Sequence, residues 1–395
     1  MAEWIEKTLG EVTSYITKGI PPKYVNDENQ FTVRVLNQKC NRNFQISYDD
    51  ARIHDGERAK VQDCKLLQEG DVLINSTGTA GRVAQIYNVP VPTTIDWHMI
   101  LIRPTDEIDF LYFGYAIKNN QRKIESLAEG STGQTEINRR RLLDEVIIRF
   151  PQEKRIQKNV GTFIYNIDEK INNNIRINNN LEQQAQAIFA NEFLSLDMLP
   201  EGWKQASLID IADYLNGLAM QKYRPTADES GIPVLKIKEL RQGFCDDNSE
   251  LCSPSIKSDY IIHDGDVIFS WSGSLLVDLW CGGICGLNQH LFRVTSNKYD
   301  KWFYYAWTKH HLDRFVAVAA DKATTMGHIK RDELAKAEVL IPNEADYNRI
   351  GALLQPIYEM IISNRMENKK LAATRDILLP KLMNGEIDMS EVDYE

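Results

Sequence analysis

The sequence predicts a mixed α/β (α+β) protein in which two similar globular domains are separated by two long antiparallel coiled-coil helices with pseudo-two-fold symmetry. Three observations lead to this prediction. The chain repeats itself once, the first part of each repeat carries short aliphatic runs between turn residues, and the second part carries a long helical apolar pattern. The 395 residues are 26% charged and 43% apolar, which is ordinary globular composition and excludes collagen-like and wholly disordered proteins.

Composition also limits the class of protein. No apolar run approaches the roughly 18–20 residues that a membrane helix needs, and the opening MAEWIEKTLG lacks the pattern of a signal peptide. Six cysteines in a chain of this length do not make a disulfide framework. We therefore expect a cytoplasmic protein with no membrane partner. The formal charge of −10 argues against a strongly basic, self-sufficient nucleic-acid binder, although local basic patches are compatible with it.

The internal repeat is visible as a series of matching motifs. WIEKTLGEV, which begins at Trp4, corresponds to WKQASLIDI, which begins at Trp203, and GDVLINSTGT corresponds to GDVIFSWSGS. Further matches are HMILIRP with HLFRV, INRRRL with IKRDEL, and EVIIRFP with AEVLIP. The offset falls from 199 residues between the two tryptophans to 191 between Pro151 and Pro342, as expected if surface loops differ in length.

Each repeat divides into a globular part and a helical part. Residues 1–151 and 199–342 carry short aliphatic runs such as DVLI and EVLI, punctuated by Gly, Pro and Asn, which indicate strands joined by turns. Each globular part is also expected to hold one or two helices, such as FLYFGYAIKNN in the first and KWFYYAWTKHH in the second. Residues 152–198 and 343–384 are predicted as the long helices, and the acidic tail 385–395 is expected to be disordered.

The helical parts show apolar residues spaced alternately three and four apart. These are Val160, Ile164, Ile167, Ile171, Leu181, Ala185 and Ile188 in the first helix, and Ile350, Leu354, Ile357, Ile361, Leu371 and Leu378 in the second. This spacing is typical of the contact seam of a coiled coil. Because only a short segment leads from the first helix into the second globular part, a two-fold relation between the repeats requires the helices to be antiparallel.

Four asparagines interrupt the seam at matching places: Asn174 and Asn178 in the first helix, Asn364 and Asn368 in the second. A polar pair in a coiled-coil seam fixes register at some cost in stability, because a buried amide needs a partner. In the antiparallel arrangement the equivalent asparagines are expected to meet near the middle. The alternative is that they lie on a solvated face.

Signatures of catalysis are absent from the sequence. It contains no GxGxxG behind a strand, no GxxxxGK[ST], no GxSxG and no HExxH, so a binding protein without catalytic residues is predicted. The region from Cys245 to Cys285 also holds Cys252 and Cys281. Their spacing suits zinc poorly and the first repeat lacks them, so buried structural cysteines are expected and no metal site is predicted. His310 and His311 are interpreted as helix-end residues and not as ligands.

Basic and small polar residues gather at corresponding places in the two repeats. In the first repeat they are Lys18, Lys23, Asn75, Ser76, Thr77, Thr79, Arg82, Gln134, Thr135, Arg139 and Arg140. In the second they are Lys222, Tyr223, Arg224, Lys236, Lys238, Ser270, Ser272, Gln289, Thr324, Thr325, His328, Lys330 and Arg331. Lys and Arg reach phosphates, and Asn, Gln, Ser and Thr reach base edges, so these are candidate DNA-binding residues. Taken alone, scattered charge also fits an ordinary solvated surface.

The whole arrangement resembles the specificity subunit of type I restriction–modification systems, over essentially the full chain. GIPVLKIKEL, EGDVLINSTGTAGRV, GDVIFSWSG and LNQHLFRV resemble motifs inside the family's target-recognition domains, and TRDILLPKLMNGEID resembles the end of its second helix. The second repeat departs from the pattern at its junction with the helix, where NEADYNRI stands in place of QEKRIQKNV.

The resemblance implies that each target-recognition domain reads one half of a bipartite site on double-stranded DNA and that the helices set the gap. It also implies modification (methyltransferase) subunits and restriction (motor and nuclease) subunits as partners. S-adenosylmethionine, ATP and Mg would then belong to those partners, and this non-catalytic chain would hold no cofactor. Two alternatives stay open: a tandem interaction scaffold that does not bind DNA, and the recognition module of a methyltransferase without a nuclease.

Overall fold

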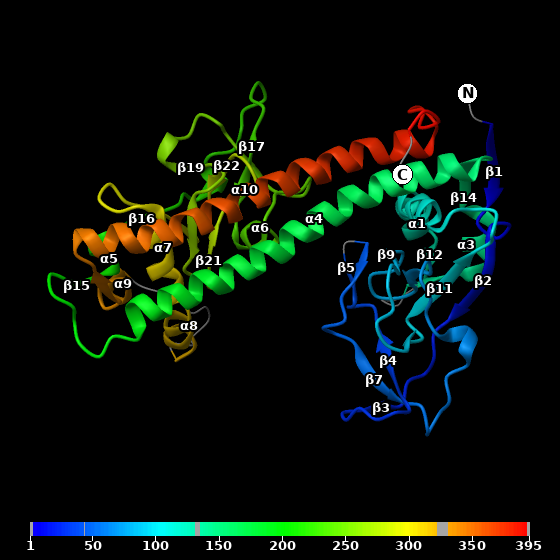
Figure 1. The fold of residues 1–395 in the computed structure, drawn as a ribbon. Helices are drawn as coiled ribbons and strands as arrows, with labels where there is room; N and C mark the ends of the chain where they lie inside the picture. Colours follow the sequence, from blue (N-terminus) through cyan, green and yellow to red (C-terminus); the bar gives the residue numbers. More distant parts are fainter. Residues whose placement is uncertain (1–2, 43, 131–134, 322–330, 393–395) are drawn as a thin grey trace. The chain divides into compact units, whose positions relative to one another are not determined.

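The computed structural model describes residues 3–42, 44–130, 135–321 and 331–392 (Figure 1). It divides into two compact units: unit 1 comprises Met1–Glu169 with Ala372–Glu395, and unit 2 comprises Lys170–Leu371. Each unit contains one predicted globular domain, which we call domain 1 and domain 2, together with one stretch of each long helix. The division between the units therefore falls inside the helices and not at the ends of the globular domains.

Two four-stranded sheets form most of domain 1. The first is antiparallel, with the order β2 (Thr13–Lys18), β11 (Met99–Pro104), β8 (Val72–Asn75), β9 (Val83–Gln85). The second has the order β10 (Thr93–Ile95), β4 (Thr32–Leu36), β7 (Arg52–Asp55), β3 (Tyr24–Val25), and its β10–β4 pair is parallel. Shorter pairs are β1 (Trp4–Thr8) with β14 (Ile147–Pro151), β5 (Asn41–Arg42) with β6 (Gln45–Ile46), and β12 (Ala128–Glu129) with β13 (Glu136–Ile137).

Domain 2 repeats this plan, except that the fourth strand of its second sheet lies on the opposite edge. Its antiparallel sheet has the order β16 (Asp213–Asn216), β23 (Leu291–Thr295), β20 (Val267–Ser270), β21 (Leu276–Leu279). Its second sheet has the order β18 (Leu251–Cys252), β17 (Ile232–Leu235), β22 (Cys285–Leu287), β19 (Ile261–Ile262), again with one parallel pair, β17–β22. β15 (Lys204–Ser207) pairs with β24 (Glu338–Ile341) as β1 pairs with β14. The repeat predicted from the sequence is thus a repeat of the fold.

The long helices are α4 (Lys154–Phe189), which continues into a π-helical turn, η2 (Ala190–Leu194), and α10 (Glu344–Met383). The shorter α-helices are α1 (Phe110–Asn119), α2 (Gln121–Ser126), α3 (Arg139–Glu145), α5 (Leu208–Ile211), α6 (Ile237–Gln242), α7 (Lys301–His310), α8 (Leu312–Asp321) and α9 (Arg331–Ala335). The 3-10 turns are η1 (Asp63–Lys65), η3 (Met220–Lys222) and η4 (Ser258–Tyr260). Across the residues described, no helix has both the length and the apolar character that crossing a bilayer requires.

The two long helices run antiparallel within each unit. In unit 1, Arg375 of α10 lies 2.6 Å from Asp168 of α4. In unit 2, Arg365 of α10 lies 3.0 Å from Glu182 of α4. Within unit 1, Asn159 bonds Met389 while Asp168 pairs with Arg375. Within unit 2, Asn174 bonds Asn368 while Asn178 bonds Asn364. The residue number therefore falls along the α10 segment and the residues that follow it as it rises along α4, which is the orientation that the two-fold repeat predicts.

Each domain shares its core with its own stretch of the helix pair. In unit 1 the buried aromatic residues of α1 pack with Ile156, Val160 and Ile164 of α4 and with Leu379 and Leu382 of α10. In unit 2 the aromatic residues of α7 pack in the same way with Ala185 and Phe189 of α4 and with Ile350 and Leu354 of α10. Burial of apolar surface stabilises such contacts by roughly 25 cal/mol per Å². Within each unit the domain and the helix pair therefore stabilise each other through one shared apolar core.

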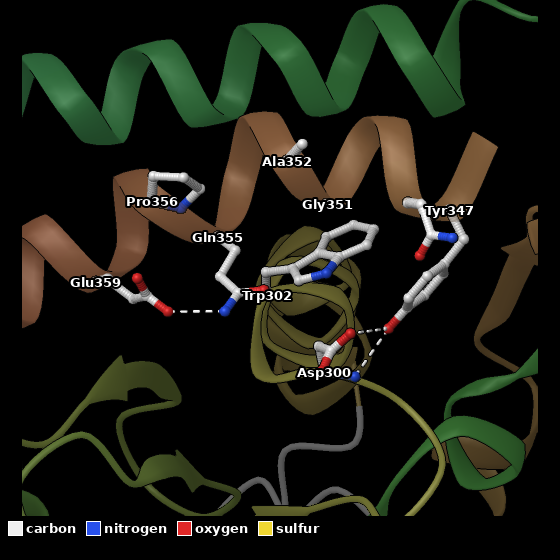
Figure 2. Close-up of a pocket in the computed structure, with 9 residues that line it drawn as sticks. Asp300, Trp302, Tyr347, Gly351, Ala352, Gln355, Pro356 and Glu359 are labelled. Atoms are coloured by element: carbon white, nitrogen blue, oxygen red, sulfur yellow. Dashed lines mark hydrogen bonds between the residues drawn. The ribbon is translucent and has the colours of Figure 1, made fainter. Parts of the chain in front are cut away.

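Each domain also meets its helix through the same polar joint. The backbone N–H of Asp109, at the start of α1, donates to the side-chain oxygen of Gln157 at 2.7 Å. In domain 2 the backbone N–H of Asp300, at the start of α7, donates to the hydroxyl of Tyr347 at 2.8 Å (Figure 2). Gln157 and Tyr347 occupy equivalent positions, 190 residues apart. Different side chains therefore satisfy the same unpaired N–H group of a helix start.

A glycine lets each joint close. Gly161 of α4 lies so near α1 that an added Cβ would be 2.8 Å from the backbone nitrogen of Tyr112. Gly351 of α10 is its equivalent, and there an added Cβ would be 2.9 Å from the indole nitrogen of Trp302. Figure 2 shows Gly351 and Trp302 facing each other beside a small cleft of about 260 Å³. No larger residue fits at either contact without displacing its neighbour.

The acidic tail differs from its prediction. We expected residues 385–395 to be disordered, but residues 385–392 lie against unit 1. The side-chain amide of Asn159 on α4 donates to the carbonyl oxygens of Met389, at 3.2 Å, and Val392, at 2.5 Å. Met389 is buried, and Ile387 packs against the same core. For residues 385–392 the prediction was wrong, because it weighed the acidic residues and overlooked the apolar ones between them. Residues 393–395 lie outside the described residues.

Candidate nucleic-acid interface

A tight turn follows the same strand in both domains. In domain 1 it comprises residues 76–79 after β8, and in domain 2 residues 271–274 after β20. Gly78 and Gly273 sit at equivalent points of these turns with φ of +69° and +66°, a left-handed conformation that other residues rarely adopt. The turn is thus a shared feature of the fold although its sequence, STGT or WSGS, differs.

A hydroxyl and an imidazole meet beside each turn. The hydroxyl of Thr77 lies 2.8 Å from Nδ1 of His98, and the hydroxyl of Ser272 lies 3.0 Å from Nδ1 of His290. The backbones are joined as well, since the N–H of Ser76 donates to the carbonyl of His98 at 2.8 Å and the N–H of Trp271 to that of His290 at 3.4 Å. The two domains hold the histidine in the same way.

A second turn carries the histidine and precedes β11 or β23. It comprises residues 96–98 in domain 1 and 288–290 in domain 2. The first turn and this second turn of a domain are together called its paired turns. The N–H of His98 donates to the side chain of Asp96 at 2.9 Å, and that of His290 to the side chain of Asn288 at 3.2 Å. An Asx residue that binds the backbone two residues on is a stable local turn.

The basic segment of each domain is held against the second turn. Ile20 forms an isolated parallel bridge with Asp96, and Leu218 forms one with Asn288. The preceding Gly19 and Gly217 pass so close that an added Cβ would lie 2.1 and 2.2 Å from the carbonyl oxygens of Asp96 and Asn288. This contact brings the segments that hold Lys18 and Lys23, or Lys222 and Arg224, beside the paired turns.

Several candidate base-reading residues are inside the domains. Asn75, Ser76, Ser270 and Ser272 are at most 2% exposed. Asn75 donates to the hydroxyl of Thr79 at 2.6 Å and accepts from Asn41 at 3.1 Å, while the hydroxyl of Ser270 donates to the carbonyl of Ser274 at 2.9 Å. All four side chains are buried among groups that shape the turn, and their predicted contact with DNA stays a prediction.

The exposed candidates fall into two groups. Lys23, Thr79, Thr135, Arg139, Lys222, Tyr223 and Arg224 are exposed, and within the described part of the chain the charged members of this group have no ion pair. Other basic candidates are paired: Lys236 with Glu250 at 2.8 Å, Lys238 with Asp246 at 3.0 Å, and Arg140 with Asp144 at 3.6 Å. Arg331 donates to the carbonyl of Tyr214 at 3.0 Å. The basic residues without an ion pair can contact phosphates without first breaking an existing interaction, unlike the paired ones.

Lys18 belongs to neither of these two groups. Its ammonium forms an ion pair with Glu136 and is partly buried. Burial lowers the pKa of Lys18, and the nearby charge of Arg139 lowers it further. The charges of Lys18 and Arg139 therefore interact, with the carboxylate of Glu136 paired to Lys18.

Arg82 lines a polar pocket of about 380 Å³ together with Arg42, Phe44 and Gln121. One guanidinium nitrogen of Arg82 donates to the carbonyl of Asn41 at 3.2 Å, and the ammonium of Lys118 lies 4.4 Å from the centre of the Phe44 ring. Arg42 was not predicted, because no motif in the sequence distinguishes it from other surface arginines.

Five candidates lie outside the described residues: Gln134, Thr324, Thr325, His328 and Lys330. Their predicted contact with DNA stays a prediction.

The seam asparagines bond across the helix pair in unit 2. Asn174 donates to the side-chain oxygen of Asn368 at 2.8 Å, and Asn364 donates to that of Asn178 at 2.8 Å. Three of the four are at most 8% exposed, so the solvated-face alternative is excluded for them. We expected equivalent residues to meet, but the equivalent of Asn174 is Asn364. A two-fold relation between the repeats converts the Asn174–Asn368 pair into the Asn364–Asn178 pair. Equivalent asparagines therefore fall in different pairs and do not meet each other.

The cysteines and the helix-end histidines have structural surroundings. The free thiols of Cys252, Cys281 and Cys285 are buried, and among the residues described no cluster of three His, Cys, Asp or Glu side chains is arranged to hold a metal. His311 ends α7, and its Nε2 lies 2.8 Å from the carbonyl oxygen of Glu338. Burial lowers the pKa of His311 to about 4.

The sequence reasoning missed three residues of the paired turns: Trp97, His98 and His290. The two histidines had been matched between the repeats, so the signal was available. Trp97 gave no signal, because its counterpart Gln289 is a different kind of residue.

Comparison with known proteins agrees with this arrangement. A family model described as type I restriction modification DNA specificity domain matches residues 1–183 and 200–373. The specificity subunit of type I restriction enzyme MjaIX from Methanocaldococcus jannaschii is 26% identical, and the match covers 88% of this chain and 85% of that protein. The specificity subunit of HindI from Haemophilus influenzae is 20% identical over 98% of this chain and all of that protein.

A solved structure has the same fold. The crystal structure of the S subunit of a type I restriction–modification system from M. genitalium superposes with a TM-score of 0.60 at 16% identity, covering 98% of this chain and 97% of that one. At this identity the likeness concerns the fold alone.

Proposed function

We propose, from the premise that this chain belongs to the type I restriction–modification DNA specificity family, that domain 1 and domain 2 each read one half of a bipartite DNA site. The observation that carries the proposal is the repetition of the paired turns. Each domain holds a basic segment and an exposed residue on a rigid buried base, and the two domains differ in the residues they expose. Two similar domains with different exposed residues would read two different half-sites.

The phosphate contacts in this proposal are the exposed basic residues that form no ion pair with another described residue, namely Lys23, Arg139, Lys222 and Arg224. Lys and Arg at phosphates supply affinity that does not depend on sequence and that falls with salt. Four such residues are few for a chain with a net charge of −10. The proposal therefore places much of the phosphate neutralisation on partner subunits that close around the duplex.

The partners in this proposal are modification subunits held beside each half-site and restriction subunits. The names of the relatives from M. jannaschii and H. influenzae, which are specificity subunits of type I restriction enzymes, support this part. S-adenosylmethionine, ATP and Mg would be bound by those partners, and this chain would be non-catalytic and act in the cytoplasm.

Replacing one domain tests the proposal. The chain is co-expressed with its modification subunit, and methylated adenines are mapped across the genome by sequencing. Exchanging residues 199–342 for the corresponding domain of another family member should change one half-site and leave the other unchanged. If both half-sites change, or if the intact chain with its modification subunit yields no bipartite motif, the assignment of one half-site to each domain is wrong.

The role of the helices as a spacer has its own test. Four residues added to a helix lengthen it by about 6 Å, against roughly 3.4 Å per base pair. Repeating four residues after Asn178 should therefore lengthen the unread gap by one or two base pairs and leave both half-sites unchanged. An unchanged gap at full methylation would mean that the partner subunits position the domains.

A further inference from the structure

The paired turns present one residue at the same point of each domain. This residue precedes the turn histidine and follows the Asx residue: it is Trp97 in domain 1 and Gln289 in domain 2. The neighbours on both sides are held by equivalent hydrogen bonds, so the backbone at this point is common to the two domains. What differs is the side chain that the backbone carries.

The side chain at this point is accessible in both domains. Trp97 is 56% exposed, more than the other exposed aromatic residues of domain 1, Tyr24 and Phe31. Gln289 is partly exposed. An exposed aromatic residue by itself has no special meaning, but this one sits on a rigid turn beside the basic segment.

The turn histidine supports the presented residue in both domains, by different chemistry. The rings of Trp97 and His98 meet edge to face with centroids 5.6 Å apart. The side-chain nitrogen of Gln289 lies 3.3 Å from Nε2 of His290. Each histidine is fixed in turn by Thr77 or Ser272 at its other nitrogen. In each domain the hydroxyl therefore holds the imidazole, and the imidazole contacts the presented side chain. These contacts limit the conformations that Trp97 or Gln289 can adopt.

We propose that Trp97 and Gln289 are specificity-determining residues, each reading part of one half-site, and that His98 and His290 are the positioning residues behind them. This inference rests on the proposed function and deepens it. A side chain that reads bases must be exposed, oriented and placed beside groups that hold the phosphates. Trp97 and Gln289 meet these conditions at the same position of the fold and differ from each other, as different half-sites require.

The chemistry of the two side chains leads to different expectations. A glutamine amide can bond an adenine through N6 and N7 in the major groove, so an adenine is expected in the half-site of domain 2. An indole offers an apolar face and a single N–H donor. Apolar groups contact the methyl group of thymine, so a thymine is expected in the half-site of domain 1.

Methylation mapping of single variants tests the inference. Trp97→Ala and Gln289→Ala are each co-expressed with the modification subunit, and methylated adenines are mapped as for the intact chain. Trp97→Ala should lower discrimination by about 5- to 150-fold at one position of one half-site. Gln289→Ala should do the same in the other half-site. Matched controls are Phe31→Ala, another exposed aromatic of domain 1, and Gln205→Ala, another exposed glutamine of domain 2; both should leave the motif unchanged.

The positioning role has a separate readout. Thr77→Val removes the hydroxyl that holds His98 but keeps the shape of the side chain. It should relax the same base position as Trp97→Ala, by a smaller factor, without lowering the melting temperature by more than the control variants do. A relaxed position elsewhere in the motif would overturn the role assigned to His98.

Failure of this inference can be told apart from failure of the proposed function. If the intact chain yields a bipartite motif, and Trp97→Ala and Gln289→Ala both yield the same motif at the same discrimination, the two residues are not readers although the domains are. If either substitution alters both half-sites, the inference is wrong as well. If the intact chain yields no motif, the proposed function itself fails.

Discussion

Unit 1 and unit 2 carry the same fold with different side chains at corresponding points, and the differences are not evenly spread. The tight turn keeps its left-handed glycine, and the turn histidine keeps its hydroxyl partner. The residue presented beside that histidine changes from an indole to an amide. Buried polar contacts that fix the backbone are retained between the repeats, because their loss leaves unpaired groups, whereas an exposed residue can change at little cost in stability.

The joint between domain and helix shows a second kind of difference, in which the contact is kept and its chemistry is replaced. Gln157 and Tyr347 accept the same backbone N–H. Asn120, at the end of α1, donates to the carbonyl of Ile147 at 3.2 Å, and its equivalent His311 meets the carbonyl of Glu338 at 2.8 Å. A comparison of the units therefore identifies which contacts the fold requires and which side chains are interchangeable.

The largest expected effect concerns the joint glycines. Gly161→Val and Gly351→Val should each destabilise their own unit by about 3 kcal/mol, because a side chain at either position overlaps its neighbour. Gly161→Val should cost more, since its Cβ meets the backbone of Tyr112, whereas the Cβ of Gly351→Val meets a side chain. Hydrogen exchange measured by mass spectrometry resolves the two units.

The control for the glycine variants is Ala352→Val, which adds a branched side chain to an exposed position of α10. It should change stability by only a few tenths of a kcal/mol. If the glycine variants behave like this control, the joints are not closely packed.

The next largest effect is a dependence of stability on pH that is expected for unit 2. His311 has a pKa of about 4, below the 6.5 of a free imidazole, so between pH 6.5 and 4 the unfolded state binds a proton that the folded state does not. Unfolding of unit 2 should therefore become easier as pH falls through this window, by on the order of 2 kcal/mol. Its equivalent Asn120 does not titrate, so this contact gives unit 1 no such dependence.

His311→Asn gives unit 2 the side chain that unit 1 has at this position and should flatten the dependence of its unfolding on pH. Urea unfolding followed by tryptophan fluorescence measures the effect, because five of the seven tryptophans lie in unit 2. His263→Gln, at an exposed position of the same domain, is the matched control. Equal flattening by the control would contradict the assignment to His311.

The smallest effect concerns the asparagine pairs. Asn178→Ala leaves the amide of Asn364 without its partner and should cost about 1–2 kcal/mol. Asn368→Ala removes the equivalent residue from the other pair, which is more exposed, and should cost less. Thermal unfolding of both variants measures the difference. Equal costs would mean that burial does not distinguish the two pairs.

A good part of the candidate site could be predicted from the sequence. The match of GDVLINSTGT with GDVIFSWSGS identified the segments that form the tight turns, and Lys23, Lys222 and Arg224 were named from their residue type and their corresponding places in the repeats. Burial of the four residues Asn75, Ser76, Ser270 and Ser272 could not be predicted, because a residue type that can read a base can equally satisfy a buried turn. Trp97 could not be found, because its position acquires meaning only when it is superposed on that of Gln289.

The sequence by itself determined the architecture of this protein. A repeat of about 190 residues and a 3-4 apolar spacing are properties of order along the chain, and they specify two equivalent domains and two helices wherever the atoms finally lie. Tertiary structure alone decided which seam asparagines pair, that the acidic tail packs on unit 1, and which polar side chains are exposed. These depend on the distances between residues far apart in the sequence, because hydrogen bonds and burial are set by positions in space that periodicity does not encode.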